Sequence, residues 1–546
     1  MSKRIKIVGN SLVVEDTVTS KQDLDRPAKD MYYDTNALDN GTIIFIERDG
    51  SKNAYIESKS ILLANAVNSL DIAFTEATFR TFVRTNLGFN SAGSSALTTK
   101  EYYQRVISDG GTVESLNCAR VALKESPTAS LLMQPTGKKA TKLYSVLPDD
   151  GTGDFTVVRN SDATYVDKNG IIQTALPNVA RIDYTDGDCG ALLLEPQSTN
   201  LVTYSEDLSN ASWSKTAGIV TSYDTITAPN GLLTADSITD NVGATSFKTL
   251  SQLVTVPVNS TITCSLFIKK ETSEVNYGGI AVEFTNPTTI KVFYAFNAVN
   301  GTFSNSLGGV LVVDSINVYD FNSDWWRIEI TATDTGSRAF VRFTYYATLS
   351  TNFTTTNFAI GSSRKLWGFQ VEAGTTATSY IPTQGSSVTR AADVVTDGGD
   401  VNTFNSEEGT LFVEMAALSD DLTQRYITIS DGSNINIVRL GYFVTSNYIL
   451  YQFNNGALTA NLATTSFDIT QQNKIAVVYK LNRFELWVNG VKKAQDTSGN
   501  TLPIDTLNVL SFTQGTQTSN LINAKVRQLQ VFKTALSDAE LISLTS

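Results

Sequence analysis

The sequence predicts a mainly β, multidomain protein, and three of its properties lead to this prediction. Hydrophobic residues make up 41% of the 546 residues and charged residues only 18%, a balance that supports folded cores and strands with polar faces. From about residue 145 onward, short apolar runs alternate with turns rich in Gly, Asn, Asp and Pro, which is typical of β-structure. The chain is also too long to fold around a single hydrophobic core, since a domain holds roughly 100–200 residues.

Residues 1–95 are expected to form a small α+β unit. Apolar residues alternate over 5–14 and run together over 42–46, which predicts two strands. Residues 73–87 predict a helix, because apolar side chains recur at three- and four-residue spacing and Gly88 follows.

Residues 96–145 are expected to form a short helical connector. Thr98 and Glu101 have the spacing of a capping box, which predicts the start of a first helix. Gly110-Gly111 breaks the pattern, and a second helix is predicted over 112–125.

Residues 146–398 and 399–546 are expected to form two β-sandwiches. In the first, short strands alternate with turns, for example over 261–268, 326–331 and 339–345, and this spacing suits a sandwich or jelly roll.

The second predicted sandwich carries two local signals. Asn489-Gly490 lies between the apolar stretch 484–488 and the stretch 491–493, and this pair supplies the positive φ angles of a hairpin turn. Ser537 and Glu540 form a capping box, so a short helix is expected to close the chain.

Several function classes are disfavoured by composition. The formal net charge of −12 opposes binding to phosphate backbones. The sequence contains no histidine, the commonest general base and zinc ligand. Cys118, Cys189 and Cys264 are far apart and odd in number, which argues against a disulfide framework.

The sequence also bears on where the protein is made. No run approaches the roughly 20 apolar residues of a membrane span, and the start MSKRIKIVGN lacks the long apolar stretch of a secretory signal. We therefore expect assembly in a cytoplasm and exit by a route other than secretion, such as release of virions by lysis.

Five motifs in the middle of the chain carry a resemblance to a known family: PNVARIDY at 177–184, LLLEPQSTNL at 192–201, WGFQVEAG at 367–374, ATSYIPT at 377–383 and VTRAAD at 388–393. Together they resemble the sandwich modules of bacteriophage head-spike and tail-fibre proteins, which are described as carbohydrate-binding-like. The resemblance covers roughly residues 130–395. It implies a virion surface protein with a jelly-roll module, carried on either the head or the tail.

The two ends of the chain carry further resemblances. FELWVNG at 484–490 and VFKTALSDAEL at 531–541 resemble laminin-G/concanavalin-like domains, which implies a β-sandwich. VVEDT at 13–17 and PAKDMYY at 27–33 resemble virion-attachment segments, which implies that residues 1–95 hold the particle. The resemblances imply a homotrimer whose partners are other virion proteins and bacterial surface polysaccharide.

Paired carboxylates are the catalytic route that remains without histidine, because capsule hydrolysis uses Asp/Glu pairs roughly 5–9 Å apart. All candidate pairs lie in turn-like segments where Asp serves local hydrogen bonding, and no β-helix repeat is present. We therefore predict a protein that is not an enzyme. The pairs are Asp149-Asp150, Asp186 with Asp188, Asp393 with Asp397, Glu407-Glu408 and Asp420-Asp421.

Aromatic side chains are candidates for glycan contact, because a flat ring covers the apolar face of a sugar; the alternative is that they fill cores. Strand alternation places Trp326 in the core and Trp325 on the opposite face. Alternation likewise separates Trp487 from its apolar neighbours, so we expect Trp487 to be exposed or at an interface, and Trp325 to face away from the core. The candidates are Trp213, Trp325, Tyr448, Tyr451 and Trp487, with Tyr223 and Trp367 also considered.

Calcium is the one cofactor that the sequence raises. Asp431 and Asp496 lie in loops of the last predicted sandwich, where related domains sometimes hold calcium through oxygen ligands. The prediction as a whole is a fibre or spike subunit that adheres to host glycans. The alternatives are a purely structural spike or capsid decoration protein without a ligand, and a polysaccharide depolymerase.

Overall fold

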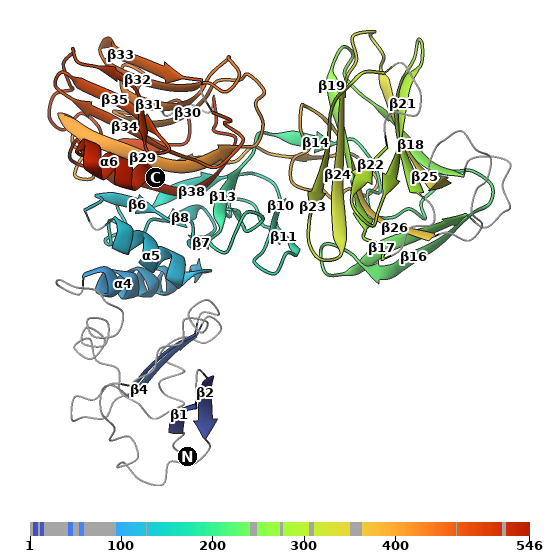
Figure 1. Ribbon diagram of the computed structural model, residues 1–546, viewed down its shortest axis with the longest axis horizontal. Helices are drawn as coiled ribbons and strands as arrows, with labels where there is room; N and C mark the ends of the chain where they lie inside the picture. Colours follow the sequence, from blue (N-terminus) through green and yellow to red (C-terminus); the bar gives the residue numbers. More distant parts are fainter. Residues whose placement is uncertain are drawn as a thin grey trace.

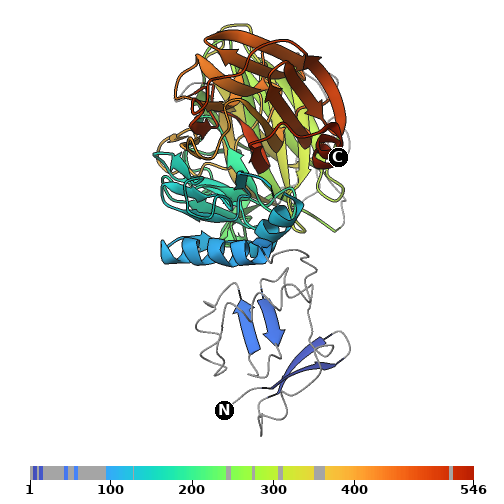
Figure 2. The same cartoon turned by 90° about the vertical axis from the view of Figure 1, so that its left-hand side faces the viewer.

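The computed structural model describes residues 4–8, 11–15, 42–46, 54–58, 94–126, 128–240, 248–272, 277–304, 311–349, 363–465, 467–515 and 520–546. Two β-sandwiches lie beside each other, and a pair of helices lies below one of them (Figure 1). The same view turned by 90° shows the helices, the sandwich above them and the N-terminal hairpins in one column (Figure 2). Strands dominate the described residues, so the predicted mainly β, multidomain fold class is confirmed.

The N-terminal unit contributes two antiparallel hairpins. The predicted strand at 42–46 is confirmed. The single strand expected over 5–14 is wrong, because the chain turns back there and Val8 lies opposite Ser11. The helix expected over 73–87 lies outside the described residues. The strands are β1 (Arg4–Val8), β2 (Ser11–Glu15), β3 (Thr42–Ile46) and β4 (Ala54–Ser58).

Two helices follow, α4 (Ser94–Ser108) and α5 (Leu116–Glu125), with β5 (Thr112–Val113) between them. The first half of the connector is therefore helical as predicted, but its second half forms three short strands, and both predicted helix starts are wrong. Position 98 lies inside α4 and not at its start. Residues 112–113 pair with a strand, so α5 begins later, where the side chain of Ser115 accepts a hydrogen bond from the backbone N–H of Cys118.

The C-terminal sandwich consists of an eight-stranded and a five-stranded sheet. The eight-stranded sheet runs β12-β13-β38-β29-β34-β35-β36, with β6 also on β38; the five-stranded sheet runs β33-β32-β31-β30-β37. The two inner faces build one core, which includes Val413, Val477 and Leu486 from the first sheet and Ile427 and Leu440 from the second. Burial of each such side chain stabilises the folded state by roughly 1.5–3 kcal/mol.

The strands of the C-terminal sandwich come from three separate stretches of the chain. They are β6 (Leu131–Met133), β12 (Ile182–Asp183), β13 (Ala191–Leu194), β29 (Glu408–Ala417), β30 (Arg425–Ser430), β31 (Asn436–Tyr442), β32 (Ile449–Asn455), β33 (Ala457–Thr464), β34 (Asn473–Lys480), β35 (Arg483–Val488), β36 (Val491–Asp496), β37 (Val509–Ser511) and β38 (Ala524–Phe532).

The middle sandwich consists of two six-stranded sheets, β15-β18-β25-β20-β21-β22 and β16-β17-β26-β19-β24-β23. The three strands predicted in this region are confirmed as β19, β24 and β25. The strands are β15 (Ser214–Lys215), β16 (Ile219–Thr227), β17 (Leu233–Asp240), β18 (Thr249–Thr255), β19 (Thr261–Lys269), β20 (Tyr277–Thr285), β21 (Ile290–Asn297), β22 (Thr302–Phe303), β23 (Val313–Asp320), β24 (Trp325–Thr333), β25 (Phe340–Leu349) and β26 (Ser363–Ala373).

Smaller sheets join these units. A five-stranded sheet runs β28-β9-β8-β7-β5, and β14 pairs with β27 where the chain enters and leaves the middle sandwich. A hairpin of β10 and β11 stands beside them. The strands are β7 (Gly137–Lys139), β8 (Lys142–Tyr144), β9 (Phe155–Val158), β10 (Ala163–Val166), β11 (Ile172–Ala175), β14 (Ser198–Asn200), β27 (Val388–Arg390) and β28 (Val394–Thr396).

Strand pairing crosses the boundaries expected after residues 145 and 398. Strands β6 and β13 take the same edge of β38, with Met133 opposite Leu529 and Leu192 opposite Val526. Segments expected in the connector and in the middle module therefore complete a sheet of the C-terminal sandwich. The middle sandwich is an insertion between β13 and β28.

The two local signals of the C-terminal region are confirmed. Strands β35 and β36 form a hairpin, and Asn489 and Gly490 have φ angles of 49° and 77° at its turn. Helix α6 (Asp538–Thr545) begins at the capping box of Ser537 and Glu540. Its Leu541 packs on the outer face of the sheet against a small buried cluster.

One disulfide joins Cys118 of α5 to Cys189, just before β13. The argument against disulfides from the odd cysteine count is therefore wrong for this pair, which lies 71 residues apart in sequence. Cys264 is a buried free thiol. Among the described residues, no helix is long and apolar enough to cross a membrane.

We predict that a chain starting at residue 146 folds poorly, because it lacks β6 and exposes part of the β38 edge. A chain starting at residue 94 keeps α4, α5 and β5–β8 and is the matched control. Thermal unfolding followed by circular dichroism, with size-exclusion chromatography, compares the two. Equal transitions and equal monodispersity would contradict the shared sheet.

Buried Asp236 gives a second prediction. Burial raises its pKa to about 6, against an ordinary value of 3.8, although the backbone N–H groups of Asp224 and Leu208 oppose the rise. Between these two values the folded state binds more protons than the unfolded state, so stability falls as pH rises and the loss is complete above about pH 6.

The Asp236→Asn substitution is expected to remove this pH dependence, which amounts to up to about 3 kcal/mol. The variant also loses one acceptor for a backbone N–H, which lowers its stability at every pH. The quantity to compare is therefore the change in the free energy of unfolding with pH. Denaturant unfolding at pH 4 and pH 7 measures this change. A variant that loses as much stability as the parent between these pH values would refute the assignment.

Candidate functional site

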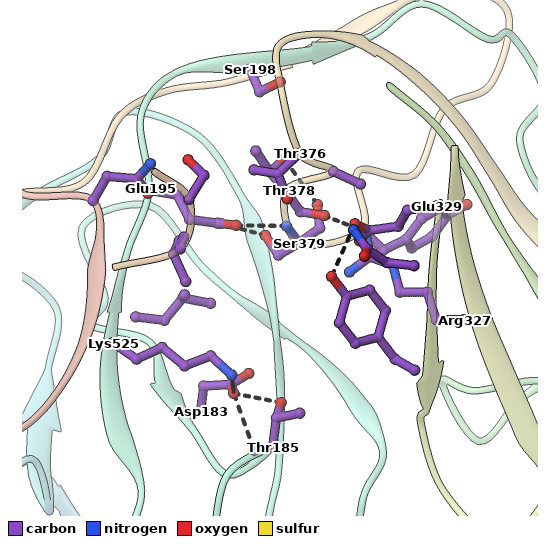
Figure 3. Close-up of a pocket in the computed structure, with 18 of the residues that line it drawn as sticks. Asp183, Thr185, Glu195, Ser198, Arg327, Glu329, Thr376, Thr378, Ser379 and Lys525 are labelled. Carbon is purple, nitrogen blue, oxygen red and sulfur yellow. Dashed lines mark hydrogen bonds and ion pairs between the residues drawn. The ribbon is translucent and has the colours of Figure 1, made fainter. Parts of the chain in front are cut away.

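A cleft of about 690 Å³ opens between the middle sandwich and the C-terminal sandwich. Its lining comes from residues 164–198, from the middle sandwich and the loop after β26, and from residues 416–421, 470–471 and 523–525. Figure 3 shows Asp183 and Lys525 on one side of the cleft and Arg327 and Glu329 on the other.

A buried cluster of charges lies behind the cleft, at the point where the chain enters and leaves the middle sandwich. Arg181 is fully buried and donates to Glu195 Oε2 at 2.5 Å and to Asp393 Oδ2. Arg159 reaches Asp393 Oδ1 at 3.0 Å, and Arg390 lies 3.5 Å from Glu195. Burial alone would raise the pKa of Glu195, but Arg390 and Arg181 lower it well below its usual range.

Ser379 connects this cluster to the cleft. Its backbone N–H and its hydroxyl both donate to Glu195, each at 2.7 Å, and its Oγ accepts from Arg181 at 2.8 Å. These hydrogen bonds fix the loop after β26 to the segment between β13 and β14. The serine and threonine side chains of this loop line the cleft (Figure 3).

The first wall of the cleft centres on Lys525 of β38. Its Nζ lies 3.2 Å from Asp183 and 2.8 Å from Asp186. Burial alone would lower the pKa of Lys525, but the two carboxylates raise it, so the lysine is charged. Asp183 also accepts from the backbone N–H and the hydroxyl of Thr185 and from the backbone N–H of Val166.

The second wall centres on Glu329 of β24, which is 3% exposed. Its carboxylate lies 3.8 Å from Arg327 and accepts from the hydroxyl of Tyr319 at 3.3 Å. Burial raises the pKa of Glu329, Arg327 opposes the rise, and nearby Glu372 adds to it. Arg327 is held in turn by the backbone carbonyl of Thr378 at 2.5 Å.

This arrangement suits a ligand with many hydroxyl groups. Both walls offer carboxylates and a cation, so each wall presents both donors and acceptors of hydrogen bonds. The half-exposed ring of Tyr319 and the ring of Tyr165 supply aromatic surface at its edge. Cavities of this size typically hold small ligands.

A second hollow of about 510 Å³ lies on the C-terminal sandwich alone, lined by residues 407–408, 455, 480–481 and 500–503. It includes the predicted pair Glu407 and Glu408. Glu408 is paired with Lys480 at 3.1 Å. This second hollow is smaller and more open than the cleft, and it lacks the buried charge cluster that holds the lining of the cleft in place.

The predicted exposure of Trp487 is wrong, and Trp325 is also buried, although the predicted alternation is correct. Trp326 packs on the main core of the middle sandwich, and Trp325 faces the other way. Trp325 is 2% exposed, because a second buried cluster covers that face. Trp487 is 3% exposed, because it packs in the buried cluster that includes Leu541 of α6.

The other aromatic candidates also lie outside the cleft lining. Trp213, Trp367 and Tyr451 are buried, so none of them is a free platform. Tyr448 is half-buried and packs near Phe443. Tyr223 is 37% exposed and is the most open of this group.

The predicted carboxylate pairs have different surroundings, and the expectation that all of them are turn residues is wrong for Asp393. Asp393 belongs to the buried arginine cluster, while Asp397 is exposed. Asp186 and Asp421 line the cleft and are paired with Lys525 and Arg425. Two of the other carboxylates accept hydrogen bonds from loop residues, as expected of turn positions. Asp150 accepts from Thr152, and Asp420 accepts from Ser446 and Asn447. Asp149 and Asp188 are exposed.

The two calcium candidates also receive local hydrogen bonds. Asp431 accepts from Ser433 and Asn436, and Asp496 accepts from Ser498. Among the described residues, no group of three His, Cys, Asp or Glu side chains could hold a metal ion. A calcium site that also uses carbonyl oxygens stays a prediction.

Residues 390–542 match the family described as the concanavalin A-like lectin/glucanases superfamily. The C-terminal sandwich therefore has a concanavalin-like lectin fold, as its motifs predicted. No curated protein matches the chain.

Three solved structures illustrate the likeness of single portions. NanB in complex with Optactamide is 15% identical, with a TM-score of 0.24, over 27% of this chain and 25% of that one. Domain 4 of AbnA, a GH43 extracellular arabinanase from Geobacillus stearothermophilus with arabinotriose, is 10% identical, with a TM-score of 0.21, over 31% and 82%. Sheep galectin-11 with glycerol is 15% identical, with a TM-score of 0.15, over 23% and 85%. The chain thus spans only about a quarter of the length of NanB.

The cleft residues were missed because the cleft exists only between two folded units. A signal was nevertheless present. The motifs PNVARIDY and VTRAAD contain Arg181 and Asp393, and ATSYIPT contains Ser379. Charged residues inside otherwise apolar motifs indicate buried ion pairs, since isolated buried charges are costly.

The arginine cluster yields a stability prediction. Arg181→Ala should cost about 3–5 kcal/mol, because it leaves two buried carboxylates short of their main partner. Arg342→Ala is the control, because Arg342 is 42% exposed in its pair with Glu283 and such a pair contributes less than about 1 kcal/mol. Denaturant unfolding followed by tryptophan fluorescence measures both, and equal losses would refute a special role for the cluster.

Proposed function

We propose that this chain is a fibre or spike subunit of a bacteriophage that adheres to host surface glycans. The observation that carries the proposal is the polar cleft of about 690 Å³ beside a concanavalin-like lectin sandwich. A lectin fold alone does not name a function. Here, however, the fold adjoins a cavity whose lining of hydroxyl, amide and carboxylate groups matches the chemistry of a sugar.

The virion role is supported by the motifs of the middle segment. Those motifs resemble phage head-spike and tail-fibre modules, and the structure uses them at the junction of the two sandwiches. In the proposal, the N-terminal unit holds the particle, three copies assemble around it, and the sandwiches face the host. Each copy then makes weak contacts with host glycans, and several copies that bind at once give firm attachment.

Adhesion is favoured over hydrolysis by the state of the carboxylates. Glycoside hydrolysis needs an acid and a base on either side of the bond. The carboxylates of the first wall are committed to Lys525, and Glu195 is committed to the arginine cluster and Ser379. In the proposal the chain therefore binds polysaccharide without cleaving it.

The full chain, fluorescently labelled, is expected to bind intact host-range bacteria saturably and to compete with particle adsorption. Reducing-sugar release is followed in the same tubes and should stay at the level of a buffer control. Heat-unfolded protein controls for nonspecific adhesion. Absence of saturable binding by folded protein would favour a structural spike protein, and sugar release would favour a depolymerase.

A further inference from the structure

The two walls of the cleft share one property, which is that carboxylates outnumber cations. On the first wall, Asp183 and Asp186 share the single cation Lys525. Asp186 lines the cleft, and its side chain is 44% exposed.

On the second wall, Glu329 has Arg327 as its cation at 3.8 Å, and Glu372 lies close enough to disfavour its ionisation. Glu372 is itself buried and accepts from Ser198 and from Thr378. Whether or not Glu329 carries a proton, this wall has no surplus positive charge.

The partners of the charged groups around the cleft bring the charges there close to balance, so no surplus positive charge remains. Six carboxylates and two basic side chains, Arg327 and Lys525, belong to the lining. Asp320 is paired with Lys270 at 2.5 Å, Asp421 with Arg425, and Glu195 with the buried arginines. Each cation of the lining faces a carboxylate, Lys525 at 2.8 and 3.2 Å and Arg327 at 3.8 Å, so neither offers an unbalanced positive charge to an anionic ligand.

We propose that the cleft between the two sandwiches binds an uncharged stretch of surface polysaccharide and excludes sugars that carry carboxylate, sulfate or phosphate groups. This inference rests on the proposed adhesin function and adds to it the place and the charge class of the ligand. Carboxylates accept hydrogen bonds from vicinal hydroxyl groups, Lys525 and Arg327 donate, and the ring of Tyr319 covers an apolar sugar face. An anionic sugar would find no surplus cation on either wall and would meet the exposed carboxylate of Asp186 in a partly desolvated cavity.

The test uses the full chain on an array of bacterial surface oligosaccharides that includes neutral, amino-bearing and acidic members. Ala373→Trp places an indole at the exposed end of β26, which lines the cleft. Ala217→Trp makes the same change in an exposed turn of the same sandwich outside the lining. Thr375→Trp, in the next loop, replaces Ala373→Trp if that variant loses its thermal transition.

The expected result is binding to neutral oligosaccharides that falls about tenfold or more in Ala373→Trp and is unchanged in Ala217→Trp. Binding of acidic or only of amino-bearing oligosaccharides through the cleft would overturn the charge class. Glycan binding that neither substitution affects would overturn the cleft as the site while leaving the adhesin function in place. Failure to bind both the array and intact cells would overturn the adhesin function itself.

Discussion

The buried pairing of Arg181 with Glu195 and Asp393 is the constraint on which the architecture depends. The chain leaves the C-terminal sandwich beside Glu195 and returns beside Asp393, and one guanidinium holds both crossings. Arg159 and Arg390 add further bonds to the same two carboxylates. Charges removed from water in this way are stable only as a complete set, so the cluster specifies one arrangement of the two crossings.

The cleft is a consequence of that arrangement. One wall is built from β38 and the β12 segment, and the other from β24 and the loop after β26. Ser379 ties the loop to Glu195, so the same bonds that close the insertion also place the lining of the cavity. Stability and recognition are therefore coupled at one junction, and the polar groups of the cleft are positioned before any ligand arrives.

The sequence was a good guide wherever structure is decided locally. Asn489-Gly490 sets its own turn, and the alternation of Trp325 and Trp487 against their neighbours is correct. Their burial was not predictable, because it depends on remote segments that cover the outer faces of the sheets, such as Leu541 on the side of Trp487. The cleft was not predictable for the same reason: Lys525 and Asp183 are 342 positions apart in the sequence, and no local pattern indicates such a contact.

The insertion has an evolutionary consequence. Because β14 and β27 run antiparallel as direct neighbours, the middle sandwich enters and leaves through a narrow neck, and domains attached in this way are readily gained, lost or exchanged. Such an exchange would replace one wall of the cavity and keep the other. If the chain is the adhesin proposed above, recombination at the neck would change its host range without rebuilding the lectin-like sandwich.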